Sequence, residues 1–155
     1  MNDAIEHEIT ISRRFDAPRE LVYRAFVDPD QLCEWYGPDG FSVPCETVQI
    51  DARPGGFQRF VMTNAADPGG RYQVEVALSE VVENKLLAGH QHVERIGGAG
   101  PADRSRLRLE FSDDADGQTR LELRQGLVPE ELGEEVKARW ESSFRNLDSL
   151  LRRSL

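Results

Sequence analysis

The sequence predicts an α+β two-layer fold in which an antiparallel sheet of six to seven strands packs against one long C-terminal helix. Apolar residues between 128 and 155 recur at spacings of three and four, which places them on one face of a helix. Between residues 42 and 125, apolar and polar residues alternate in short runs separated by turn residues, as in antiparallel hairpins. The apolar face of the helix needs a partner surface, and the sheet provides one.

Length and composition indicate one globular domain over residues 1–155. The chain has 39% hydrophobic and 30% charged residues, which is ordinary for a globular protein. Its formal net charge of −9 argues against nucleic-acid binding, which needs a basic surface. No apolar run reaches the roughly 18–20 residues of a membrane span, and residues 1–11 lack the pattern of a secretory signal. We therefore expect a cytoplasmic protein.

Two short helices are expected after a first strand at residues 5–15. Asp16 is a suitable N-cap and Pro18 a suitable first-turn residue for the first of them. Asp28-Pro29 ends that helix, and a second one follows to about residue 34.

Six further strands precede the long helix. They are expected over residues 42–51, 57–63, 72–78, 85–93, 106–111 and 119–125. Within 42–51 the alternation changes between Cys45 and Val48, which indicates a bulge. The long helix then presents an apolar face made of Leu132, Val136, Trp140, Phe144, Leu147, Leu150 and Leu151, with acids at its start and arginines at its end.

The cysteines and histidines give no metal pattern. Cys33 and Cys45 are too few for a disulfide scaffold, and we expect both to be reduced. His90 and His92 lie two apart on a predicted strand and could share a face, but zinc needs a third or fourth ligand. We expect no metal and no cofactor.

Several motifs resemble a known superfamily. The succession of Phe15-Asp16-Ala17-Pro18, Asp28-Pro29 and Trp35 resembles the START-like helix-grip superfamily (SRPBCC). The run Asp51–Gly56, Met62 and the spacing of Trp140, Leu147 and Leu150 resemble its branch named after the C-terminal domain of the heat-shock-protein 90 ATPase activator homologue. The resemblance covers residues 8–151. Two positions depart from it: Arg139 stands where a glycine is usual, and Gln58 where an aromatic or aliphatic residue is common.

The resemblance implies a curved sheet that grips the long helix around a cavity for a lipid, sterol, polyketide or other apolar molecule. Such a site needs an apolar lining with a few polar groups. The alternation of side chains along the predicted elements and the resemblance together predict thirteen lining residues: Trp35, Tyr36, Phe41, Gln58, Phe60, Met62, Tyr72, Val74, Phe111, Leu123, Trp140, Phe144 and Leu147. The alternative is a solid core that the same residues fill. Gln58 either orients a ligand through its amide or, if the strand parity is shifted by one, faces solvent.

Three functions remain open at this point. The first is a binding protein for an apolar small molecule, and the second is a chaperone-cofactor module that binds a chaperone or another protein. The third is a cyclase or hydrolase with Gln58, Tyr72 and the histidines as first suspects, although no Gly-x-Ser-x-Gly or phosphate-loop motif occurs. A homodimer is a further alternative, and the glycine-rich loop at 94–104 is either a lid or a disordered segment.

Overall fold

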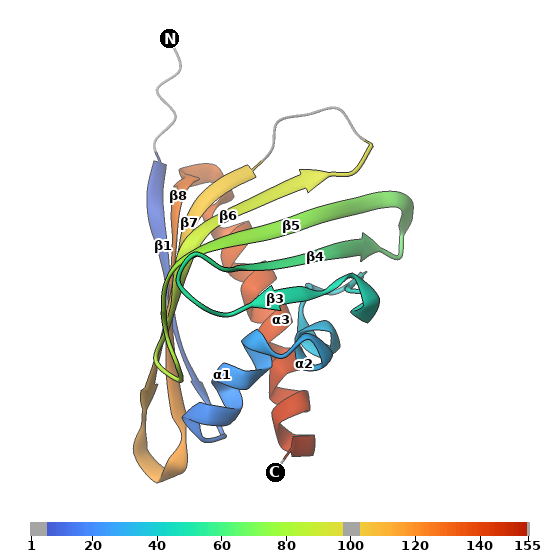
Figure 1. Ribbon diagram of the computed structural model, residues 1–155. Coiled ribbons are helices and arrows are strands. Elements are labelled where there is room, and N and C mark those ends of the chain that lie inside the picture. Colours follow the sequence, from blue (N-terminus) through green and yellow to red (C-terminus); the bar gives the residue numbers. More distant parts are fainter. Residues whose placement is uncertain (1–5, 98–102, 155) are drawn as a thin grey trace.

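The computed structural model describes residues 6–97 and 103–154 (Figure 1). Ile5 of the expected first strand, residues 98–102 of the loop at 94–104, and Leu155 lie outside the described residues. The elements in chain order are β1 (Glu6–Phe15), α1 (Arg19–Val27), α2 (Pro29–Trp35), β2 (Phe41–Ser42), the 3₁₀ turn η1 (Cys45–Thr47), β3 (Gln49–Asp51), β4 (Phe57–Asn64), β5 (Asp67–Val82), β6 (Leu86–Arg95), β7 (Asp103–Asp113), η2 (Ala115–Gly117), β8 (Thr119–Pro129), η3 (Glu130–Leu132) and α3 (Gly133–Ser154).

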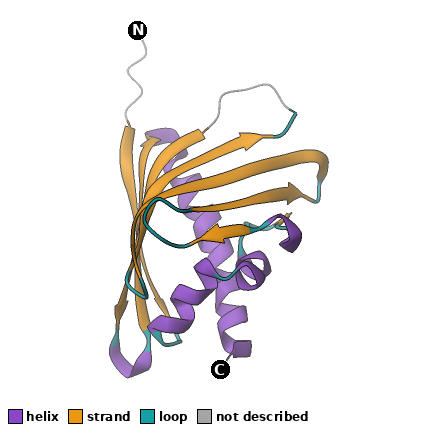
Figure 2. Ribbon diagram, viewed as in Figure 1, coloured by secondary structure: helices purple, strands orange, loops and turns teal. Residues whose placement is uncertain are grey.

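The strands form one antiparallel sheet in the order β1-β8-β7-β6-β5-β4-β2, with β3 also paired to β4. The sheet curves around α3, and α1 and α2 lie beside the C-terminal half of that helix (Figures 1 and 2). The predicted α+β helix-grip fold is therefore confirmed. The sheet has eight strands because the single strand expected over residues 42–51 is divided in two.

A 3₁₀ turn, η1, interrupts the expected strand at 42–51. The Thr47 hydroxyl donates to the Pro44 carbonyl at 2.7 Å and accepts from the Val61 amide at 3.1 Å. The side chain thus takes up a β4 amide that a continuous strand would have bonded through its backbone. The change of alternation in this stretch marked the turn, but its interpretation as a bulge was wrong.

The helix boundaries also differ from the expectation. Strand β8 continues to Pro129, where it still pairs with β1, so α3 begins at Gly133 rather than at residue 128. A Cβ at Gly133 would lie 3.2 Å from Nε2 of His7, so the absent side chain lets β1 pack closely there. Leu132 is consequently in η3 and 41% exposed, not part of the buried helix face.

Aspartate caps the second short helix rather than the first. Helix α1 begins after Pro18 without a side-chain cap, so the prediction of Asp16 as N-cap was wrong. The Asp28 carboxylate accepts from the Asp30 amide at 2.9 Å and caps α2, with Pro29 at its first position.

Cys33 and Cys45 form a disulfide, which overturns the expectation of two reduced thiols. The bond joins α2 to η1, with the two Cα atoms 5.1 Å apart. The cysteines are twelve positions apart in the sequence, and only the packing of α2 beside η1 brings them together. No helix within residues 6–97 and 103–154 is long and apolar enough to span a membrane.

Candidate functional site

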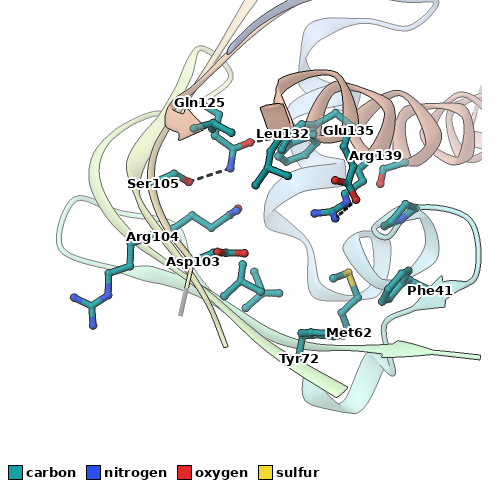
Figure 3. Close-up of a pocket in the computed structure, with 18 of the residues that line it drawn as sticks. Phe41, Met62, Tyr72, Asp103, Arg104, Ser105, Gln125, Leu132, Glu135 and Arg139 are labelled. Atoms are coloured by element: carbon teal, nitrogen blue, oxygen red, sulfur yellow. Dashed lines mark hydrogen bonds and ion pairs between the residues drawn. The ribbon is translucent and has the colours of Figure 1, made fainter. Parts of the chain in front are cut away.

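A pocket of about 410 Å³ lies between the concave face of the sheet and the N-terminal half of α3. Its walls come from β4 to β8, from η3 and α3, and from the segment between α2 and β2 (Figure 3). This volume falls within the range of small-molecule sites. The described part of the chain therefore contains a hollow large enough for a ligand.

Strand alternation and register build the apolar wall. Met62 of β4 pairs with Tyr72 of β5, and Val74 of β5 pairs with Val93 of β6, so the four side chains share the concave face. Phe41 stands beside this wall, with its ring centroid 6.1 Å from that of Tyr72. One side of the pocket thus offers a continuous apolar surface (Figure 3).

A line of polar side chains crosses the opposite wall. The Trp140 indole donates to Oε1 of Gln125 at 2.8 Å, and Nε2 of Gln125 donates to the Ser105 hydroxyl at 3.0 Å. These bonds connect α3 to β8 and β8 to β7, which holds the helix at a fixed distance from the sheet. On the adjacent strand β6, Gln91 also lines the pocket, and its buried Oε1 has no hydrogen-bond partner within the described residues.

Charged residues lie at the rim, and two of its three arginines are in ion pairs. Arg139 pairs with Glu135 at 2.7 Å, and Arg95 pairs with Asp67 at 3.3 Å. The side chain of Arg104 points away from the pocket (Figure 3). The rim therefore presents cations that are either neutralised or turned outward.

The Tyr36 phenol lines the pocket beneath the rim. Its ring lies edge-on to Phe60 and to Trp140, at centroid distances of 4.6 Å and 5.9 Å. Burial raises the pKa of Tyr36, because the phenolate would lose its hydration there. The group is therefore a neutral hydroxyl at physiological pH.

The thirteen predicted lining residues fall into two sets. Six of them line the pocket: Tyr36, Phe41, Met62, Tyr72, Val74 and Trp140. The other seven are packed in the core beyond it: Trp35, Gln58, Phe60, Phe111, Leu123, Phe144 and Leu147. The ten of them that lie on β4, β5, β7, β8 and α3 are on the interior side of their elements, but alternation could not tell a pocket wall from a filled interior.

Gln58 lies on the concave side but has a structural partner. It is 5% exposed, and its Nε2 donates to the Phe26 carbonyl at 2.6 Å, which ties β4 to the end of α1. With Phe60 it contacts a second cavity of only about 10 Å³, the size of one water. Gln58 thus does not line the larger pocket, and the alternative of a solvent-facing Gln58 was wrong.

The sequence analysis missed the polar wall and much of the rim. Among the missed lining residues are Gln91, Ser105, Gln125, Leu127, Leu132, Val136 and Arg139. A signal for Gln125 existed, because it shares parity with Leu121 and Leu123. Gln91 lies between His90 and His92 on β6, so its side chain is on the opposite face from the two histidines that the sequence analysis considered as candidates.

His90 and His92 alternate with Gln91 and so occupy the convex face, away from the pocket. His92 lies 3.8 Å from Glu94. The described residues contain no group of three or more His, Cys, Asp or Glu side chains that could hold a metal ion. Amides, hydroxyls and an indole form the polar part of the pocket wall, and such groups bind and orient a ligand through hydrogen bonds.

Comparisons with known proteins identify relatives over nearly the whole chain. The family model for Activator of Hsp90 ATPase homolog 1-like protein matches residues 16–152. A protein of Chromobacterium violaceum is 25% identical, with a TM-score of 0.77, and the match covers 93% of this chain and 96% of that one. The AHSA1 protein of Silicibacter pomeroyi has 23% identity and a TM-score of 0.79, over 96% of this chain and 100% of that chain. No curated protein matches the chain.

Proposed function

Since the chain belongs to the family of Activator of Hsp90 ATPase homolog 1-like proteins, we propose that it binds an apolar small molecule, such as a lipid or a polyketide-like compound, in the pocket beside α3. The observation that carries this proposal is a hollow of about 410 Å³ with one apolar wall, opposed by amides and hydroxyls that can orient a ligand. Interiors are normally close-packed, so a hollow of this size forfeits contacts that a ligand would restore.

Access to the pocket supports the same proposal. Leu127 and Leu132 line it and are 50% and 41% exposed, so the apolar surface continues from the interior to the rim. An apolar ligand can enter along these leucines, and Arg139 at the same rim is already paired with Glu135.

Native mass spectrometry of the freshly purified protein, followed by extraction under denaturing conditions, tests the proposal. We expect one small apolar molecule per chain. Val93→Trp should displace it, because Val93 lines the pocket. The matched control is Glu94→Trp, which puts the same ring on the next residue of β6, an exposed position outside the pocket lining. A clean mass for the wild type, with no thermal shift across a panel of lipids and polyketides, would contradict the proposal.

A second candidate function is a chaperone-cofactor module that binds another protein. The exposed leucines at 127 and 132 favour it, because apolar side chains at a rim are common in protein contacts. The test is the ATPase rate of a purified Hsp90 with and without this chain. Stimulation that is lost in a Leu127→Ser/Leu132→Ser variant would support this role, and an unchanged rate would exclude it for that chaperone.

A further inference from the structure

Gln91 stands out among the pocket residues because it is buried without a hydrogen-bond partner. Its side chain is 9% exposed, it lines the pocket, and its Oε1 has no donor within residues 6–97 and 103–154. Buried amides are normally bonded, since an unpaired one loses its hydration without compensation. In this structure the oxygen is enclosed, so a ligand reaches it when the Gln91 amide turns toward the pocket that its side chain lines.

Ser105 provides the complementary group. It is the register partner of Gln91 across β6 and β7, so the two side chains stand side by side, with Cβ atoms about 4.5–5.5 Å apart. The Ser105 oxygen already accepts from Gln125, which leaves its own proton available to donate. Gln125 is in turn held by the Trp140 indole, so the hydroxyl is positioned before any ligand arrives.

A ligand hydroxyl satisfies both groups at once. It would donate its proton to Oε1 of Gln91 and accept the proton of Ser105. An apolar group would leave the Gln91 oxygen unpaired, and an ether or ketone could accept from Ser105 but not donate to Gln91.

The charges around the pocket argue against an acidic end group at this position. Arg139 and Arg95 are paired with Glu135 and Asp67, and Arg104 points away from the pocket. The register partner of Gln91 is the neutral Ser105, which is hydrogen-bonded to the equally neutral Gln125. A carboxylate bound there would be desolvated without a cation to balance it.

We infer that the ligand is a neutral amphipathic alcohol or phenol whose hydroxyl is bound by Gln91 and Ser105 while its hydrocarbon part lies against the wall of Met62, Tyr72 and Val93. The inference rests on the proposed function, because it names the chemical class of ligand for the same pocket. It excludes fatty acids and other carboxylates as preferred ligands.

Three probes with one hydrocarbon body and different end groups test this inference: 4-butylphenol, butylbenzene and 4-butylbenzoate. Their affinities are measured by titration calorimetry at neutral pH with the wild type, Gln91→Leu and Ser105→Ala. We expect the wild type to bind the phenol about tenfold more tightly than the hydrocarbon, and the benzoate more weakly than the phenol. Each substitution should reduce the preference for the phenol to about twofold or less, while the affinity for butylbenzene is retained.

Stability of the unliganded protein gives an independent measurement. Gln91→Leu replaces an unpaired buried amide with an apolar group of similar size, so the unfolding temperature should stay the same or rise. The matched control is Gln73→Leu on β5, whose amide donates to the Phe60 carbonyl at 3.2 Å, and it should lower the unfolding temperature. A clear loss of stability in Gln91→Leu would show that the amide has a structural partner, such as a buried water in the small cavity that it also touches, and would overturn the inference.

The outcomes separate this inference from the proposed function. Equal affinity for phenol and hydrocarbon, a preference that survives Gln91→Leu, or tighter binding of the benzoate would overturn the hydroxyl site and leave the apolar pocket standing. Failure of all three probes to bind the wild type would overturn both.

Discussion

The two halves of α3 face the same sheet with the same helical spacing, yet only one is fully packed. In the C-terminal half, Phe144 and Leu147 are completely buried, and the Phe144 ring contacts Phe15 at a centroid distance of 5.5 Å. In the N-terminal half, Val136 is half-buried and borders the pocket. Helical spacing thus determines which face turns to the sheet, but not how closely the sheet approaches.

The difference arises from what packs beside each half. Helices α1 and α2 fill the space beside the C-terminal half (Figure 1). Asn146 of α3 donates to the carbonyls of Trp35 and Gly37, both at 3.3 Å, and Arg153 approaches Glu34 at 3.6 Å. The N-terminal half faces the concave sheet across the pocket, held by the hydrogen bond from Trp140 to Gln125. We call these the packed half (residues 144–154) and the hollow half (residues 133–143).

The largest expected loss of stability comes from removing a buried side chain of the packed half. Phe144→Ala removes a ring that is 0% exposed and should lower the free energy of unfolding by about 3–5 kcal/mol. In the hollow half, Val136→Ala removes only two methyl groups and should cost under about 1 kcal/mol, because that side chain already borders open space. Urea unfolding followed by circular dichroism compares them. Equal losses would mean that the two halves do not differ in packing.

The disulfide reinforces the helix that packs beside the packed half. It joins α2, which leads into Tyr36, to η1. Removing a cross-link over twelve residues should cost about 3 kcal/mol through the entropy of the unfolded chain. We expect Cys33→Ser and the reduced wild type to share one unfolding midpoint, below that of the oxidised wild type. Identical midpoints for oxidised and reduced wild type would rule out a structural role for this bond.

Arg13 links β1 to the packed half of α3 through an ion pair with Asp148. Its guanidinium donates to both oxygens of Asp148, at 2.9 Å and 2.7 Å, and hydrogen bonding to Asp148 raises the pKa of Arg13. Arg13→Ala should cost about 1–2 kcal/mol, because it leaves a half-buried carboxylate unpaired. Arg14→Ala, one residue away, removes a more exposed arginine that is paired with Asp114 and should cost clearly less. Thermal unfolding of the two variants measures the contrast.

The smallest expected effect concerns Tyr36 at alkaline pH. Because burial raises its pKa, the folded protein keeps the phenol proton where the unfolded chain loses it, above a pH of about 10. Its contribution is therefore complete below pH 10 and declines as the pH rises, by about 1 kcal/mol at pH 11. Tyr36→Phe should lose less stability than the wild type between pH 9 and 11. Some loss will persist, since burial also raises the pKa of Tyr23. Parallel curves for both proteins would exclude a buried Tyr36 phenol.

Local patterns predicted most of the architecture. The alternation in β4 placed Gln58, Phe60 and Met62 on the concave face, where the structure has them. The strands expected over 72–78 and 85–93 left a turn between them, where Asn84 has a φ of 64°. These successes share a cause, because side-chain direction along a strand or helix follows from backbone geometry alone.

The sequence could not predict which residues of the concave face are packed in the core and which line the pocket. Phe60 and Met62 have the same parity on the same strand, yet Phe60 is packed in the core and Met62 borders the pocket. The disulfide was missed because it depends on the approach of α2 to η1. Gln91 and Ser105 are neighbours because of the register in which β6 pairs with β7, and the sequence does not predict that register.

The sequence by itself therefore determined the order of elements, the helix-grip class and the apolar face of each element. These follow from periodicities of about 2 and 3.6 residues, which act locally along the chain. Only the tertiary structure decided where the sheet bends away from α3, which polar side chains meet in the hollow between them, and that Cys33 reaches Cys45. Those features depend on distances between segments far apart in the chain, and such distances are set by the packing of all the elements together.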